Sequence, residues 1–203
     1  MKIRDLIPDA APFLADLEPW EATSQSDDVV RTWFVLLAQG YIADRDYTIR
    51  DGVAIHATAI VEAGAVLKAP CVIGPHCFVA AYAYLRGGVW LEDNVIIGPS
   101  CELKSTFIHR GSKTAHFNFI GDSVIGRNVN IEAGAILANY CNERDDKRIR
   151  VRIDEDLHDT GVDKFGACVG DGTRIGANAV LAPGTLLKPR SLVRRLELID
   201  QTN

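Results

Sequence analysis

VAIHATAIVEAGAVLKAPCVIGPHCFVAAYAYLRGGVWLEDNVIIGPSCEL, residues 53–103, places an aliphatic residue at every sixth position. These positions hold only isoleucine, leucine or valine: Ile55, Val61, Leu67, Ile73, Val79, Leu85, Leu91, Ile97 and Leu103. Two residues before each of them stands a small or β-branched residue. A period of six fits neither an α-helix, with its period of about 3.6, nor a flat strand. It indicates a solenoid in which each hexapeptide forms one short side of a coil.

Three hexapeptides would make one triangular turn, so that Ile55, Ile73 and Leu91 stack on one face at the spacing of paired strands. The pattern resumes at two later stretches: Ile125, Ile131 and Leu137, and then Val169, Ile175, Leu181 and Leu187. In the first run, three of the small positions are cysteines: Cys71, Cys77 and Cys101. The spacing therefore predicts a mainly β solenoid with these thiols inside its core.

The length and composition indicate a globular protein of about one domain. It has 203 residues, of which 47% are hydrophobic, and a net charge of −5, which disfavours a broad nucleic-acid surface. No apolar run approaches the ~18 residues of a membrane span, and charge and proline interrupt the N-terminal stretch where a signal peptide would need its apolar core. The five cysteines show no zinc-binding spacing. We expect a cytoplasmic protein with reduced structural thiols and no bound metal.

The repeat divides the chain into three parts. Residues 1–50 lack it and form a helical extension, with a helix over residues 24–40 that Ser24 or Ser26 caps and Gly40 ends. We expect this helix to plug an open end of the solenoid, with partner docking as the alternative. The solenoid itself covers residues 51–190. Residues 191–203 read as a short helix or a frayed tail.

Residues 141–164 interrupt the solenoid with a charged stretch that is poor in core residues. Long loops on a rigid scaffold are often functional. This insertion either reaches a neighbouring subunit or forms a solvated flap, and the sequence leaves both readings open.

One coil breaks the regular spacing. From Leu103 to Ile125 the steps are five, six, six and five residues, through Ile108, Thr114 and Ile120. Within this coil stands the segment GSKTAH, residues 111–116, which ends in a histidine. We expect the short steps to relax the aliphatic stack so that His116 faces a substrate. We expect the other four histidines to be surface residues: His56, His76, His109 and His158.

The hexapeptide pattern over about residues 52–190 resembles the hexapeptide-repeat acyltransferases, whose fold is a left-handed parallel β-helix. The stretch LKSTFIHRGSKTAHFNFIGDSVIGRNVNIEAGAILANY, residues 103–140, is more specific. It looks like the acetyltransferase domain of the bifunctional UDP-N-acetylglucosamine pyrophosphorylase and glucosamine-1-phosphate N-acetyltransferase, and its spacing matches without gaps from Arg86 to Tyr140. No counterpart of that family's nucleotidyltransferase domain is present in the sequence.

The resemblance implies a role for each matched residue. His116 would be the general base, and Arg86 with Lys104 would hold the sugar phosphate. Asn130, Asn139 and Tyr140 would surround the sugar and the thioester, and Phe119 stands where the family usually has a tyrosine. Lys147, which follows the Asn-Tyr pair, is the candidate counterpart of a further family lysine. The positions matched to coenzyme A binding are Asp171, Ala177 and Ala182.

These matches predict an acetyl-CoA-dependent N-acetyltransferase that acts on an amino-sugar phosphate such as glucosamine 1-phosphate, as a homotrimer with sites between subunits. Two alternatives stay open: an acyltransferase for another sugar or nucleotide-sugar, and a non-catalytic sugar-nucleotide-binding or regulatory protein on the same scaffold. Zinc carbonic anhydrases of this fold need two histidines five residues apart in one chain. The histidine separations here are 20, 33, 7 and 42 residues, so they do not fit.

Overall fold

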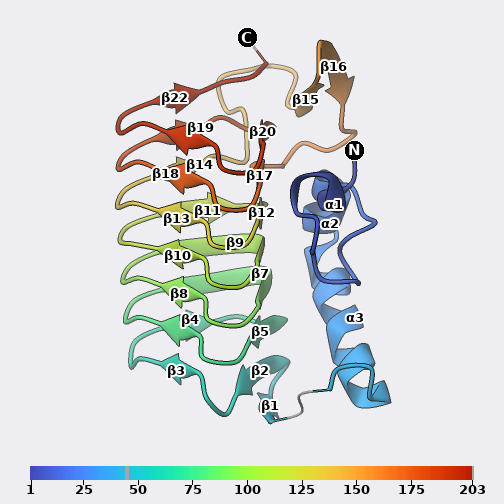
Figure 1. The fold of residues 1–203 in the computed structure, drawn as a ribbon, viewed down its shortest axis with the longest axis vertical. Coiled ribbons are helices and arrows are strands. Elements are labelled where there is room, and N and C mark those ends of the chain that lie inside the picture. The colour runs from blue at the N-terminus through green and yellow to red at the C-terminus, as the bar shows by residue number, and fades with distance from the viewer. Residues whose placement is uncertain (44–45, 203) are drawn as a thin grey trace.

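The computed structural model describes residues 1–43 and 46–202 as a stack of short parallel strands wound into a solenoid, with three helices alongside it (Figure 1). The helices are α1 (Ile3–Leu6), α2 (Pro19–Ser24) and α3 (Ser26–Gln39). None of the helices in the described part of the chain is long and apolar enough to span a bilayer.

Each coil has three faces, which we name A, B and C in chain order. Face A holds β2 (Val53–His56), β5 (Cys71–Ile73), the second halves of β7 (Tyr84–Leu91) and β9 (Glu102–Ile108), β12 (Val124–Ile125), β17 (Ala167–Val169) and β20 (Thr185–Leu187). Face B holds β3 (Ile60–Val61), β6 (Phe78–Val79), β8 (Ile96–Ile97), β10 (Lys113–Thr114), β13 (Asn130–Ile131), β18 (Arg174–Ile175) and β21 (Leu192–Val193).

Face C holds β4 (Val66–Leu67), the first halves of β7 and β9, β11 (Phe119–Gly121), β14 (Ile136–Leu137), β19 (Val180–Leu181) and β22 (Leu198–Ile199). Strands β7 and β9 run across the corner from face C to face A, with an irregular register between Arg86 and Val89. We name the three corners AB, BC and CA after the faces that they join.

The core follows the sixfold spacing. Ile55 pairs with Ile73 and Ile73 pairs with Leu91 in parallel register, as predicted. All five cysteines are buried free thiols, and Cys71, Cys77 and Cys101 lie in the main apolar cluster inside the coils. Burial raises the pKa of Cys71 and of Cys77 to about 12, so these thiols stay protonated and inert. The predicted fold class, a left-handed parallel β-helix with an N-terminal helical extension, is confirmed.

The N-terminal segment lies along face A and does not plug an end, so that prediction is wrong (Figure 1). Its apolar side chains, including Ile7, Leu14 and Trp33, form one buried cluster with the outward-facing residues of face A. Those outward residues are all apolar: Ala54, Val72, Trp90, Phe107, Val124, Cys168 and Leu186. Such a column would expose a large apolar patch if nothing covered it. The solenoid therefore needs this cover along its side.

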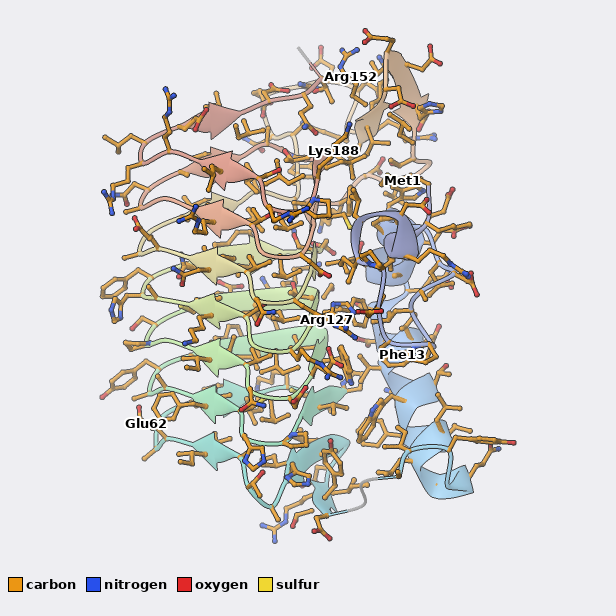
Figure 2. The ribbon with its side chains drawn as sticks, in the orientation of Figure 1. Met1, Phe13, Glu62, Arg127, Arg152 and Lys188 are labelled. Carbon is orange, nitrogen blue, oxygen red and sulfur yellow. The ribbon has the colours of Figure 1, made fainter. Side chains whose placement is uncertain are left out.

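Polar contacts fix the N-terminal segment in place. Arg127 projects from the coils toward this segment (Figure 2), and its Nη1 lies 2.7 Å from Asp9 Oδ2. The backbone N–H of Ala11 donates to His109 Nε2 at 3.4 Å, and His109 Nδ1 lies 2.8 Å from the Ile125 carbonyl. Burial lowers the pKa of His109. His109 is thus part of the interface, and its assignment to the surface is wrong.

His56 is also buried, whereas His76 and His158 are exposed as predicted. In α3, Val30, Trp33 and Leu37 form the buried stripe, and Gly40 ends the helix with a φ of 84°.

Neither predicted serine caps α3, because its N-cap is Gln25. The Ser26 hydroxyl instead donates to the Gly87 carbonyl at 2.7 Å, which ties the start of α3 to the CA corner.

Two further segments differ from expectation. The insertion forms an antiparallel hairpin, β15 (Arg150–Ile153) with β16 (Asp156–Asp159). Ile149 and Val151 are buried in the same cluster as the N-terminal segment, so the insertion packs on its own chain and is more than a solvated flap. The predicted helix or frayed tail over residues 191–203 is wrong for the described residues, because β21 and β22 continue the coil. Strand β1 (Tyr47–Arg50) pairs antiparallel with β2 at the other end.

Candidate functional site

The shortened steps build the CA corner, not the turn that carries His116. Both five-residue steps, Leu103 to Ile108 and Ile120 to Ile125, cross from face C to face A, whereas His116 lies in the BC corner between six-residue steps. Our explanation that the broken spacing frees the histidine is therefore wrong. At the tight corners Ser105 and Asp122 adopt left-handed backbone, with φ of 50° and 43°. Non-glycine residues in that region often mark functional sites.

Lys104 and Asp122 form a buried ion pair at this corner. The Lys104 Nζ lies 2.7 Å and 2.9 Å from the two carboxylate oxygens of Asp122, and 3.2 Å from Ser105 Oγ. The Asp122 side chain is only 4% exposed. Asn139 donates its amide to the same carboxylate. Asp122 therefore holds two of the predicted substrate-binding side chains in fixed positions, although the motif comparison did not single it out.

Arg86 stacks beside Lys104 in the register that the 18-residue spacing predicts. Its guanidinium pairs with Glu102, with Nε at 2.8 Å and Nη2 at 2.6 Å from Oε1, and lies 5.8 Å from the centre of the Tyr84 ring. Each cation thus has a carboxylate of its own. The two cations can therefore lie side by side without a bridging anion.

A hollow of about 330 Å³ opens beside this ion pair. Its lining combines the corner with two segments from elsewhere in the chain: Lys104, Ser105 and Asp122 with Val162, Asp163 and Lys164 and with Thr23 and Ser24. Lys164 was not among the predicted residues, yet it brings a second ammonium group to the hollow. Lys147 does not line it, because its Nζ donates to the Cys141 and Asn142 carbonyls. Both ammonium groups lie over the Tyr140 ring, with Lys147 Nζ 5.2 Å and Lys164 Nζ 6.0 Å from its centre.

The remaining predicted acceptor residues spread over face C and face B. Phe119 faces outward and half-buried on face C, between the BC corner and the CA corner. His116 is exposed at the BC corner, and the next residue, Phe117, is 70% exposed with a φ of 54°. The chain therefore brings Lys104, Asn139 and Tyr140 together at the CA corner, but leaves His116 on the opposite edge of face C.

Asn130 faces outward on face B, in a second hollow of about 540 Å³. Arg174, Arg194 and Arg195 also line this hollow, and Arg195 Nη2 lies 2.8 Å from Glu132 Oε1. The Glu132 carboxylate also accepts the backbone N–H of Ala177 at 2.9 Å. Hydrogen bonding to Arg195 lowers the pKa of Glu132, so the carboxylate stays ionised. The arginines outnumber the acid, which suits an anionic ligand.

The three predicted coenzyme residues do not come together in this chain. Asp171 lies at the AB corner, where its carboxylate accepts the Arg127 backbone N–H at 2.7 Å and joins neighbouring coils. Ala177 lies at the BC corner and Ala182 at the CA corner. The described residues contain no group of three His, Cys, Asp or Glu side chains that could hold a metal ion.

Comparison with known proteins agrees with the repeat and the motif. Residues 70–105 match the family "Bacterial transferase hexapeptide (six repeats)". The chain is similar to the "Bifunctional protein GlmU" of Marinobacter nauticus, at 36% identity over 68% of this chain and 24% of the relative.

The GlmU of Methanocaldococcus jannaschii is 32% identical over 86% of this chain and 45% of the relative. The chain thus spans between about a quarter and a half of the length of these two relatives. Among solved structures, the acetyltransferase domain of PglB from Neisseria gonorrhoeae covers 86% of this chain and 59% of that chain, at 17% identity and a TM-score of 0.37. The fold of this chain is defined by its own coils.

Proposed function

We propose that the protein is an acetyl-CoA-dependent N-acetyltransferase that acts on an amino-sugar phosphate such as glucosamine 1-phosphate. The observation that carries the proposal is the hollow lined by Lys104, Asp122 and Lys164, with Asn139 bonded to the Asp122 carboxylate. Lys104, Asp122 and Asn139 belong to the stretch that matches an acetyltransferase domain without gaps. The similarity to the GlmU relatives supports the same activity.

The acceptor's phosphate suits the CA corner. Lys104 and Lys164 supply two ammonium groups at the hollow, and Arg86 adds a planar fork of donors one coil away. Asp122 holds Lys104 in place, so less side-chain entropy is lost when a ligand binds. Phe119 offers its ring without the hydroxyl of the family's tyrosine, so the sugar would lose one hydrogen bond there.

The reaction needs a base for the acceptor amine. The amine nitrogen attacks the thioester carbonyl carbon, a proton leaves the nitrogen, and the C–S bond breaks to release the thiol of coenzyme A. An imidazole suits this proton transfer near neutral pH. His116 is exposed and carried on a rigid coil, so it can take this role once the acceptor is held nearby.

The coenzyme suits the hollow on face B. Arg174 and Arg194 would meet the phosphates of acetyl-CoA, and Asn130 and Gly176 also line this hollow, next in the chain to Ala177. Asp171 and Ala182 lie on other corners, so they would join the coenzyme only from another subunit or in a structural role.

A homotrimer would complete the site, because one subunit leaves His116 and Lys104 on opposite edges of face C. Bulky apolar residues mark the BC corner as a contact surface. Tyr82, Phe117 and Leu196 each have positive φ and are more than two-thirds exposed. Such residues are costly in the left-handed region and unfavourable in water. A second copy that covers this corner would bury all three, of which Phe117 directly follows His116 in the chain. We place the trimer in the cytoplasm, where its buried free thiols would stay reduced.

The test is acetyl-CoA consumption by the purified protein with a panel of amino-sugar phosphates, their unphosphorylated sugars and amino-sugar nucleotides. The proposal predicts turnover with a phosphorylated amino sugar and none with the unphosphorylated one. Turnover only with a nucleotide-sugar would favour the other acceptor class. An absence of turnover with every acceptor, with sugar-nucleotide binding retained, would favour the non-catalytic alternative.

A further inference from the structure

The hollow beside Lys104 is only partly made by the solenoid. Thr23 and Ser24 come from the end of α2, about 80 residues before Lys104 in the chain. Val162, Asp163 and Lys164 come from the arm by which the insertion returns to the coils. The N-terminal segment, which covers the apolar column of face A, thus also reaches the candidate acceptor site.

The returning arm is fixed to the CA corner by backbone hydrogen bonds. Phe165 donates its N–H to the Asn139 carbonyl at 3.1 Å, and Gly166 donates its N–H to the Asp122 carbonyl at 2.9 Å. Lys164 directly precedes these two residues, so its backbone has little freedom. The arm therefore presents the Lys164 side chain from a defined position next to the Lys104–Asp122 pair.

The end of α2 is fixed against the same arm and the same corner. The Trp20 ring packs edge-on against Phe165, with ring centres 6.0 Å apart. Ser26 is bonded to the Gly87 carbonyl, and Gly88 lies so close to the Ser26 backbone that a Cβ there would come within 2.6 Å. Thr23 is buried, and its hydroxyl donates to the Pro19 carbonyl at 3.1 Å. This wall is built before any ligand arrives, which favours binding.

Ser24 is the member of this wall that can meet a ligand. Its side chain is exposed and lines the hollow, and its hydroxyl donates to the Glu21 carbonyl at 3.0 Å. With its proton used in that bond, the oxygen still has a lone pair to accept a hydrogen bond from a sugar hydroxyl. A hollow of about 330 Å³ fits a single phosphorylated sugar better than a nucleotide-sugar.

We propose that the end of α2 and the returning arm form the outer wall of the acceptor pocket, with Ser24 as a specificity-determining residue for a monosaccharide phosphate. This inference rests on the proposed function, because it takes Lys104 and Lys164 as the site of the acceptor's phosphate. It gives the N-terminal extension a role in substrate choice besides its role as a cover.

The test compares Ser24→Tyr with Thr32→Tyr. Thr32 is a matched control, because it is an exposed helix residue whose hydroxyl donates to the Asp28 carbonyl at 3.0 Å, and it lies on α3 outside the hollow. We expect Ser24→Tyr to raise the KM for glucosamine 1-phosphate by about tenfold or more and to leave the KM for acetyl-CoA within twofold, because only the acceptor meets this wall. Thr32→Tyr should change neither. An unchanged acceptor KM in a folded Ser24→Tyr protein would overturn the proposal.

Calorimetric binding of glucosamine 1-phosphate without acetyl-CoA separates this proposal from the proposed function. If the wild type binds the sugar phosphate and Ser24→Tyr binds it about tenfold more weakly, the assignment of the outer wall is supported, even if neither protein shows turnover. If both proteins bind the sugar phosphate equally, the assignment of the outer wall is wrong, even if the wild type shows turnover. If the wild type does not bind the sugar phosphate at all, the pocket assignment is wrong as well.

Discussion

Replacing Lys104 with methionine separates its structural role from its role toward the substrate. The Lys104 ammonium lies 2.7 Å and 2.9 Å from the oxygens of Asp122, a side chain that is 4% exposed. Methionine would leave this carboxylate with Asn139 as a neutral donor. Breaking a buried pair costs about 3–5 kcal/mol, and the 19% exposure of the Lys104 side chain places the loss near the lower end, at about 3 kcal/mol. In a chain of this length that corresponds to a fall in Tm of about 6–12 °C.

The double variant Lys104→Met/Asp122→Asn removes both charges and should recover most of this stability. The backbone of Asp122 is left-handed, with a φ of 43°. Asparagine is among the non-glycine residues that best tolerate this conformation. The acceptor's phosphate would still lack the Lys104 ammonium, so the KM for glucosamine 1-phosphate should stay raised by at least about tenfold. Urea unfolding and acetyl-CoA kinetics measure the two effects. A single variant as stable as the wild type, or a double variant with a normal acceptor KM, would refute the reasoning.

Two further predictions concern the N-terminal interface and the assembly. Because burial lowers the pKa of His109 below its ordinary 6.5, folding opposes its protonation, and stability should fall by up to about 1.4 kcal/mol per pH unit below pH ~6.5. His109→Gln should lose this dependence between about pH 7.5 and 5.5 in urea unfolding, and an unchanged slope would contradict the assignment. Phe117→Asp should shift the trimer to monomers in sedimentation with little change in Tm, whereas a wild type that sediments as a stable monomer would exclude the trimer.

The sequence predicts the core of this fold well because one spacing determines it. In every coil the same position faces inward, so a period of six identifies the buried residues and their parallel register, as in the column from Ile55 to Leu91. The sequence also carried a second signal that we missed. The residue before each inward one on face A is apolar, from Val72 through Trp90 to Leu186, and this column required a cover along the side of the solenoid.

The site was harder to predict, because a motif names residues but not their partners. The match located Lys104 and Asn139, yet their common partner Asp122 depends on how a five-residue step turns the CA corner. Lys164 was missed because the insertion interrupts the six-residue spacing, so the match could not be extended past Tyr140. Only the fold shows where the arm returns to the coils. The contribution of α2 to the hollow had no local sequence signal, since Ser24 meets Lys104 through packing of distant segments.

The most direct test of the central claim is the rate of acetyl-CoA consumption with glucosamine 1-phosphate, measured for the wild type and for His116→Ala. His116 is exposed and outside the core, so its loss should leave Tm, assembly and acetyl-CoA binding unchanged. We predict a rate lower by about 10² to 10⁴ at neutral pH, with a residual reaction that rises with pH as more of the acceptor amine loses its proton. Near-normal acetylation by His116→Ala, or a wild type without acetyl-CoA consumption that depends on the sugar phosphate, would contradict the account.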